Sequence, residues 1–373
     1  MRLNVFSRAA AVALVGVVAA VAGCTASHSY KAGPETLVVT RADAGRAGLS
    51  PRWQRQVGLT EGETISEIWR VGDSLYVSTS DHQLHSINAA AGTTNWVADM
   101  GKAAIHIYRP QETKGAKYVY VITRGRVFAI DKRLGDITTS HDLGFSATCD
   151  PIVTEDTLCV GGADRYHGLY YDPLAGVKWG LAAPHDFFVA RPVLQGGGLF
   201  VASQSGLLWR LNPKTGSPDW FDRKTNGEVK APLTADASRL YIPCMDRRLY
   251  CFDANNGRPL WDTRLDGTLD QAALAAGASV LCVGRGKGLY CLNSSNGEIK
   301  WNLPGVEQII SRSGDHVYAA DGSGSLLSIA MDTGTVDSKL SLANVLEYVP
   351  NDLDGLIFAV TRDGRIAALE AAK

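Results

Sequence analysis

The chain has almost no net charge and no long apolar run, and each shortage excludes a class of protein. Its 373 residues include 37 basic and 38 acidic side chains, which gives a formal net charge of -1. Such a balance lacks the basic field that attracts phosphates, so DNA and RNA are not expected partners. The apolar run near the N-terminus, residues 9–21, is too short to cross a membrane as a helix.

Helical apolar periodicity is also scarce after residue 50, whereas turn-forming residues are frequent. The chain contains 39 glycines and 14 prolines, and 45% of its residues are hydrophobic. This combination favours many short strands joined by tight turns, with enough apolar material for a large core.

The N-terminus has the pattern of an export signal. Arg2 and Arg8 accompany the apolar run, which ends in Val21-Ala22-Gly23-Cys24 and resembles the lipobox of bacterial lipoproteins. We expect a signal peptide over residues 1–23, lipidation of Cys24 and a flexible tether over residues 24–50. Thr25, rather than Asp, follows the cysteine, which by resemblance to Gram-negative sorting predicts an outer-membrane anchor facing the periplasm.

A repeat of about 40 residues runs from residue 53 to the C-terminus. Each copy has an apolar residue followed by Asp or Asn, then a glycine four residues later that suits a tight turn with positive φ. The apolar-Asx pairs are Ile87-Asn88, Ile130-Asp131, Tyr171-Asp172, Leu211-Asn212, Phe252-Asp253 and Leu292-Asn293, with degenerate copies at Ile329-Ala330 and Leu369-Glu370. Eight copies with four short strands each predict an all-β fold, an eight-bladed β-propeller over residues 51–373.

Tryptophans recur shortly after the glycine, and we expect them to dock between neighbouring blades rather than to stack on a ligand. They are Trp53, Trp96, Trp179, Trp220, Trp261 and Trp301. The second and seventh copies lack this tryptophan and should form the weaker blades. The last copy stops after its third strand, so residues 53–57 are expected to supply its outer strand as an N-terminal clasp.

With Asx, Gly and Trp at fixed offsets, the chain resembles the pyrroloquinoline-quinone-like (PQQ-like) β-propeller repeat family. The lipobox, tether, eight repeats and clasp together resemble its BamB-like outer-membrane assembly lipoproteins. That resemblance implies a non-enzymatic scaffold that binds envelope proteins, including the barrel-assembly subunit, as a monomer within a larger complex. Residues 227–232 depart from the BamB contact segment, so the resemblance implies no contact residues here.

Two other functions stay open on the sequence: another exported binding or adaptor propeller, and a quinoprotein-type oxidoreductase. Quinone enzymes often place two adjacent cysteines against the cofactor, and the chain has no such pair. Its carboxylates, among them Asp150, Asp186, Asp246 and Asp270, show no spacing typical of a metal site. His82 and His85 are expected in a solvated hairpin. We therefore expect no catalytic residue, no metal and no cofactor, PQQ included.

Two small sets of residues are candidates for specific roles. If the inner strands begin where we expect, Asp150, Arg191 and Lys230 converge at the funnel of the central channel and can bind a partner. Cys282 and Cys291 are expected on adjacent strands of one blade, where they could form a disulfide or simply pack as small buried hydrophobes.

Overall fold

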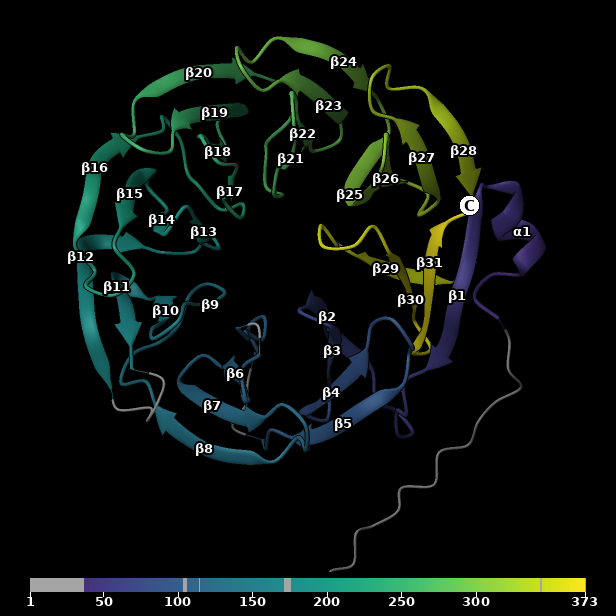
Figure 1. The fold of residues 1–373 in the computed structure, drawn as a ribbon, viewed down its shortest axis with the longest axis horizontal. Coiled ribbons are helices and arrows are strands. Elements are labelled where there is room, and N and C mark those ends of the chain that lie inside the picture. Colours follow the sequence, from purple (N-terminus) through teal and green to yellow (C-terminus); the bar gives the residue numbers. More distant parts are fainter. Residues whose placement is uncertain (1–36, 103–105, 114, 171–175, 343, 373) are drawn as a thin grey trace, which may run out of the picture.

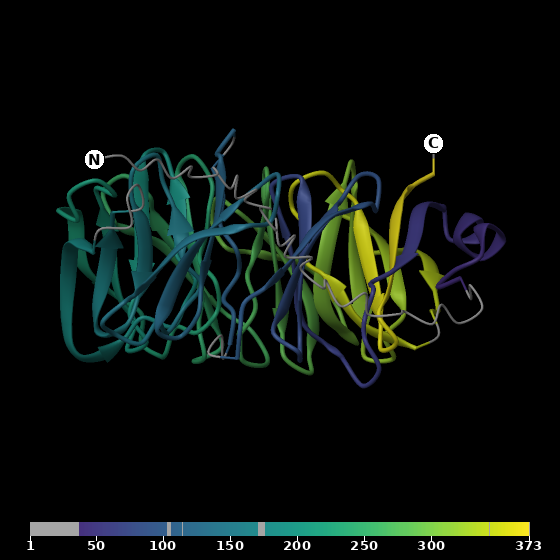
Figure 2. The same cartoon turned by 90° about the horizontal axis from the view of Figure 1, so that it is seen from below.

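The computed structural model describes residues 37–102, 106–113, 115–170, 176–342 and 344–372. Within them the strands form eight sheets that follow one another around a central axis, as expected for an eight-bladed β-propeller (Figure 1). Seen from the edge, the ring is a disc about one strand length thick (Figure 2). The signal peptide, Cys24 and the repeat pair Tyr171-Asp172 lie outside the described residues.

Each blade is an antiparallel sheet, and in blades 1 to 7 the first strand along the chain lies innermost. Blades 1 to 4 contain β2 (Ile65–Val71), β3 (Ser74–Thr79), β4 (Gln83–Asn88) and β5 (Thr94–Asp99); β6 (Tyr118–Ile122), β7 (Arg126–Asp131) and β8 (Ile137–Asp142); β9 (Ile152–Val153), β10 (Leu158–Gly161), β11 (Ala163–Leu169) and β12 (Val177–Phe187); and β13 (Val193–Gln195), β14 (Gly198–Ala202), β15 (Leu207–Leu211) and β16 (Pro218–Lys224).

Blades 5 to 7 contain β17 (Thr234–Ala235), β18 (Arg239–Pro243), β19 (Arg248–Asp253) and β20 (Pro259–Arg264); β21 (Leu274–Ala276), β22 (Ser279–Gly284), β23 (Gly288–Asn293) and β24 (Ile299–Leu303); and β25 (Val306–Ser313), β26 (His316–Asp321), β27 (Leu326–Ala330) and β28 (Val336–Leu340). Blade 8 contains β29 (Val345–Val349), β30 (Ile357–Thr361), β31 (Arg365–Ala371) and, on its outer edge, β1 (Leu49–Gln56).

The N-terminal strand closes the ring. β1 pairs antiparallel with β31 from Leu49 opposite Ala371 to Gln56 opposite Arg365, with one register shift between Pro51 and Trp53. The first and last strands of the propeller thus share one sheet, so β31 is not left as the outer edge of that blade.

The last part of the range expected to be a flexible tether, residues 24–50, is folded in the structure. Helix α1 (Arg41–Arg46) begins at Thr40, whose side chain accepts a hydrogen bond from the Asp43 amide, and it packs beside β28. Ala44 is fully buried, and the Ser338 hydroxyl donates to the Ala47 carbonyl at 2.8 Å. Small apolar residues that read as linker composition are therefore the buried face of a docked segment.

The repeated tryptophans cover the seams between blades. Each indole N–H donates to a main-chain carbonyl of the following blade, at 2.8 to 3.2 Å, in the pairs Trp53–Ala89, Trp96–Lys132, Trp179–Pro213, Trp220–Ala254, Trp261–Ser294 and Trp301–Met331. The indole lies against the turn glycine of that blade: a Cβ on Gly297 would stand 2.5 Å from Trp261. Glycine serves here both for its positive φ and for this close approach.

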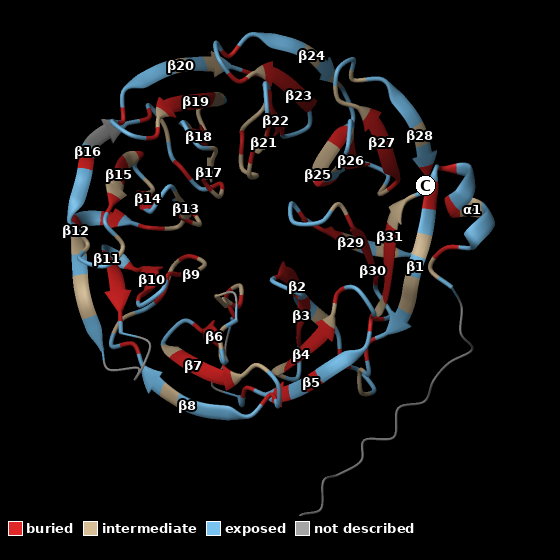
Figure 3. Ribbon diagram, in the orientation of Figure 1, coloured by how far each residue is buried: buried red, intermediate tan, exposed pale blue. Residues whose placement is uncertain are grey.

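Apolar side chains from facing blades fill the spaces between sheets, and the outermost strands are the most exposed (Figure 3). Cys282 and Cys291 lie on adjacent strands but on opposite faces of blade 6, because Cys282 pairs with Tyr290 and Cys291 pairs with Leu281. Each packs in a different interblade core, and all six described cysteines are free. The possible disulfide is therefore wrong, and the alternative of small buried hydrophobes applies.

In the described part of the chain, no helix has the length and hydropathy needed to span a bilayer.

Candidate functional site

Strand register places five charged residues at equivalent positions on the inner side of consecutive blades. In each of these blades, one residue of the innermost segment pairs with the equivalent residue of the second strand, and the charged residue lies two positions before it. The pairs are Val349–Phe358, Trp69–Tyr76, Gln111–Tyr120, Ile152–Cys159 and Val193–Phe200. We call these five residues the charged sector; they are Glu347, Glu67, Arg109, Asp150 and Arg191, from blades 8 and 1 to 4. Blades 5 to 7 carry uncharged residues at this position, namely Pro232, Ala272 and Ile309.

Hydrogen bonds tie the charged sector to its neighbours. The Asp150 carboxylate accepts from the backbone N–H of Arg109 at 3.1 Å, which joins blade 3 to blade 2. The Arg109 guanidinium donates in turn to the carbonyl of Arg70 in blade 1. Arg70 is only 5% exposed and forms a 2.9 Å ion pair with Asp354 of blade 8. These contacts hold four consecutive blades in register around the axis.

Burial, and then like charges within the sector, shift the pKa of two of its members, Arg109 and Glu347. Burial lowers the pKa of the Arg109 guanidinium to about 10, with the positive charge of Arg191 lowering it further and Asp150 opposing the change. Burial also raises the pKa of Glu347 to about 7, and the neighbouring Glu67 adds to that shift. Acidic side chains thus gather at blades 8 and 1, and basic ones at blades 2 and 4. Perturbed groups clustered in this way are typical of functional sites.

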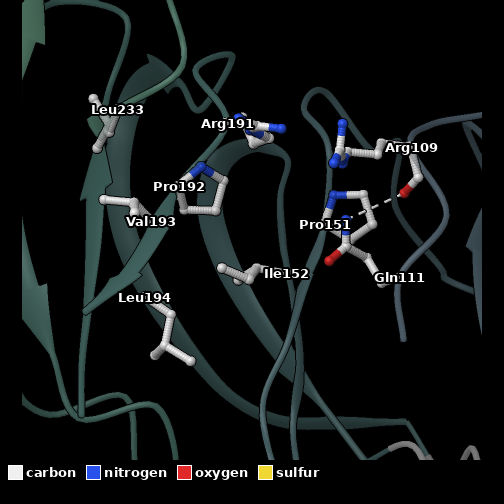
Figure 4. Close-up of a pocket in the computed structure, with 9 residues that line it drawn as sticks. All are labelled: Arg109, Gln111, Pro151, Ile152, Arg191, Pro192, Val193, Leu194 and Leu233. Atoms are coloured by element: carbon white, nitrogen blue, oxygen red, sulfur yellow. Dashed lines mark hydrogen bonds between the residues drawn. The ribbon is translucent and has the colours of Figure 1, made fainter. Parts of the chain in front are cut away.

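A hollow of about 200 Å³ opens beside the basic part of the sector (Figure 4). Arg109 and Arg191 point toward each other at one side of it, above Pro151. The rest of the wall is mostly apolar and comes from blades 3 to 5, through Ile152, Pro192, Val193, Leu194 and Leu233. Within the described residues, neither guanidinium forms an ion pair with a carboxylate. The hollow therefore combines two positive charges with an apolar floor.

The three predicted partner-binding residues do not all meet. Asp150 and Arg191 both belong to the charged sector, and both are connected through Arg109. Lys230 does not line the hollow; it is exposed and forms a 2.6 Å ion pair with Glu228, which also accepts from Gln204. Asp150 and Arg191 thus both neighbour Arg109, whereas Lys230 lies in the connection before β17 and not at the sector position, and Asp150 does not line the hollow either. Partner binding by these three residues stays a prediction.

Sequence reasoning missed Arg109, Glu67 and Glu347. A signal for Arg109 was present, since Arg109-Pro110 repeats the charged-residue-proline pattern of Asp150-Pro151 and Arg191-Pro192. Glu67 and Glu347 lack that proline, and bulges shift the register of both inner strands just before them. Only the strand pairing could align these two with the arginines.

The other carboxylates that were considered have structural partners on separate blades. Asp186 accepts from the Ser205 hydroxyl, Asp246 accepts from the Tyr250 hydroxyl, and Asp270 pairs with Arg285. No cluster of three or more His, Cys, Asp or Glu side chains suited to a metal occurs among the residues that the structure describes.

Comparison with known proteins identifies related chains. A family model described as "Outer membrane protein assembly factor BamB" matches residues 13–221 and 220–344. The chain is 24% identical over 210 residues to the BamB of Yersinia pestis, covering 48% of this chain and 53% of that protein. It is 23% identical over 394 residues to the BamB of Burkholderia pseudomallei, covering 98% of each. The aligned region thus spans about half of the first relative and nearly all of the second.

Solved structures show the same fold. The crystal structure of BamB from Moraxella catarrhalis superposes with a TM-score of 0.69 at 15% identity, covering 86% of this chain and 97% of that one. The computationally designed Ika8 protein superposes with a TM-score of 0.64 at 13% identity, covering 82% and 96%. Because the family model accounts for most of the eight repeats as well as the N-terminal region, this chain belongs to the BamB family of PQQ-like β-propellers.

Proposed function

We propose that the chain is a lipid-anchored scaffold that assists outer-membrane protein assembly in the manner of BamB. The observation that carries the proposal is the match of the BamB family model to residues 13–344 of a closed eight-bladed ring. Cys24 would carry the lipid and hold the propeller at the outer membrane, facing the periplasm. In this role the chain works by protein–protein contact with envelope proteins, including the barrel-assembly subunit.

The charged sector and the adjacent Lys230 segment are the contact surface in this proposal. Opposite charges on neighbouring blades favour a partner of complementary charge pattern, which improves specificity and the association rate more than raw affinity. Asp150 and Arg191, which both neighbour Arg109, supply the two signs, and Lys230 extends the surface beyond the hollow.

No cofactor and no catalysis form part of the proposal. Asp186, Asp246 and Asp270 are engaged by hydroxyls or by arginine, and they lie on different blades. A general base for quinone chemistry must instead stand free beside the cofactor and its cation. The arrangement supports a binding propeller over an oxidoreductase.

The test is affinity purification of the lipidated protein from crosslinked native membranes, followed by mass spectrometry. We expect the barrel-assembly subunit and its accessory lipoproteins to co-purify. A variant with Arg191→Glu and Lys230→Glu should recover less of them at an unchanged melting temperature. Arg258→Glu, an exposed arginine outside the charged sector, is the matched control and should recover as much as the wild type. Absence of barrel-assembly proteins with an intact bait in the membrane would reject the proposal.

A further inference from the structure

Arg109 and Arg191 face the same hollow, and among the described residues neither guanidinium forms an ion pair with a carboxylate, although Asp150 and Asp352 act on Arg109 at longer range. The Arg109 guanidinium donates to the Arg70 carbonyl. The Asp150 carboxylate accepts from the backbone N–H of Arg109 and forms no ion pair with the Arg109 guanidinium. Arg191 contributes its backbone carbonyl to Leu233, at 3.0 Å, and leaves its guanidinium toward the hollow. Two unpaired like charges brought together are unfavourable, and an anion between them would relieve that repulsion.

The nature of the anion follows from the rest of the wall. Below the arginines the lining is apolar apart from Gln111, whose amide donates to the Arg109 carbonyl, and Leu194 remains 37% exposed there although it is a leucine. A phosphate or sulfate would match the guanidiniums but would leave this apolar surface in water. A ligand with a carboxylate beside an apolar group matches both parts, because guanidinium binds carboxylate in a planar, two-point geometry.

The geometry points to a site for the C-terminal residue of a polypeptide, with its carboxylate between Arg109 and Arg191 and its apolar side chain against Ile152, Val193 and Leu194. The hollow is open on one side, so the preceding residues of the ligand can leave along the inner face of blades 3 and 4. Recognition of a chain end by charge and one side chain leaves the remainder of the ligand unspecified, which suits a scaffold that meets many unfolded chains.

This inference takes from the proposed function the idea that the ligand is a protein. The carboxylate chemistry of the ligand follows from the hollow itself.

Binding is measured by fluorescence anisotropy with the purified full-length chain and a labelled hexapeptide that ends in leucine with a free carboxylate. The same peptide with an amidated C-terminus is the main control, because it needs no change in the protein. We expect the amide to bind about tenfold more weakly, as loss of one charge-assisted contact predicts.

Two variants complete the test. Arg191→Gln should weaken the free-acid peptide by a similar factor and abolish the difference between acid and amide. Arg258→Gln removes one exposed positive charge elsewhere and should leave both affinities unchanged. Arg109 is less suitable, since its guanidinium also bonds the main chain of blade 1.

Equal binding of acid and amide, binding of neither, or an unchanged affinity of Arg191→Gln would overturn the inference. N-acetyl-leucine that competes as tightly as the hexapeptide binds would overturn the assignment to a polypeptide end in favour of a small acid. If barrel-assembly proteins do not co-purify from the crosslinked membranes but the chain still distinguishes the acid from the amide, only the assembly role is rejected. If they co-purify but the chain does not distinguish acid from amide, only the carboxylate site is rejected.

Discussion

At the scale of single residues, the repeat is explained by one contact between a glycine and a tryptophan. The Asx side chain accepts backbone hydrogen bonds within the turn, as Asp253 does from Asn255 and Asn256. The glycine four residues later then has positive φ and exposes bare backbone to the indole of the preceding blade. The spacing seen in the sequence is therefore the spacing of an interblade contact.

This contact predicts a difference between two glycines with similar backbone conformation. Gly297 and Gly305 have φ of +75° and +82°, but only at Gly297 would a Cβ meet another side chain, at 2.5 Å from Trp261. Gly305→Ala should cost about 1 kcal/mol of unfolding free energy from backbone strain. Gly297→Ala should cost about 2 kcal/mol more because of overpacking. Urea unfolding measures both, and equal losses would contradict the role of the contact.

Glu347 predicts a pH dependence of stability. Its pKa is about 7 in the folded protein, above the ordinary value of 4.5 expected when unfolded, so folding favours the protonated form. This stabilisation is complete below pH 4.5 and is lost as the pH rises toward and through 7. In thermal melts, the stability of Glu347→Gln relative to the wild type should increase between pH 4.5 and pH 7. Above pH 7 the difference in stability should stay constant.

The matched control for this experiment is Glu61→Gln, a substitution at an exposed glutamate. It should follow the wild-type curve across the same pH range. A Glu347→Gln profile parallel to that of the wild type would show that the carboxyl is not protonated in the folded state.

The placement of the cysteines predicts that no disulfide forms between them, with or without reductant. Burial raises the pKa of Cys282 and Cys291, and the two thiols lie in different interblade cores. In a Cys24→Ser chain denatured without reductant, alkylation should add six groups per molecule, one for each free cysteine of the structure. Four adducts, restored to six by reductant, would instead indicate one disulfide.

At the scale of elements, the N-terminal segment has two separable tasks. β1 completes the sheet of blade 8, whereas α1 covers the core beside β28, where the seventh repeat has no tryptophan. The helix thus packs where the repeat leaves a gap, with Ala44 and Ala47 buried against blades 7 and 8.

Two truncations distinguish these tasks. Removal of residues 1–47 takes α1 but leaves β1, and should lower the unfolding free energy by about 2 kcal/mol through lost apolar burial and one hydrogen bond. Removal of residues 1–57 also takes the clasp and should open the ring, so that the cooperative thermal transition is lost. Circular dichroism melts compare the two, and identical curves would show that β1 does not close the ring.

At the scale of the whole molecule, the ring is not uniformly stable. The sequence marks both the second and the seventh blades as weaker, since neither has the repeated tryptophan. The structure separates them. In blade 2, β8 is almost entirely exposed, and the described part of the inner segment makes only isolated bridges, through Ile107 and Gln111. Blade 7 instead has four strands, and α1 covers it at the edge.

Hydrogen exchange should therefore be faster in blade 2 than in blade 7. Peptides covering residues 126–142 are expected to lose protection earlier than those covering residues 326–340, because exchange reports local opening of poorly packed strands. Blade 5, with a docked Trp220 before it and Trp261 after it, is the internal reference. Equal protection of blades 2 and 7 would show that α1 adds nothing to its seam.

The sequence by itself determined the number of blades, the turn chemistry, the docked tryptophans and the strand that closes the ring. These features are local or periodic, so one copy of the repeat predicts the next. The tertiary structure decided the end of the tether, the opposite faces of Cys282 and Cys291, and the charged sector. Each of these depends on register, since a shift of one residue moves a side chain to the other face of a strand. Bulges before Glu67 and Glu347 set that register, and the facing blades determine which charges meet.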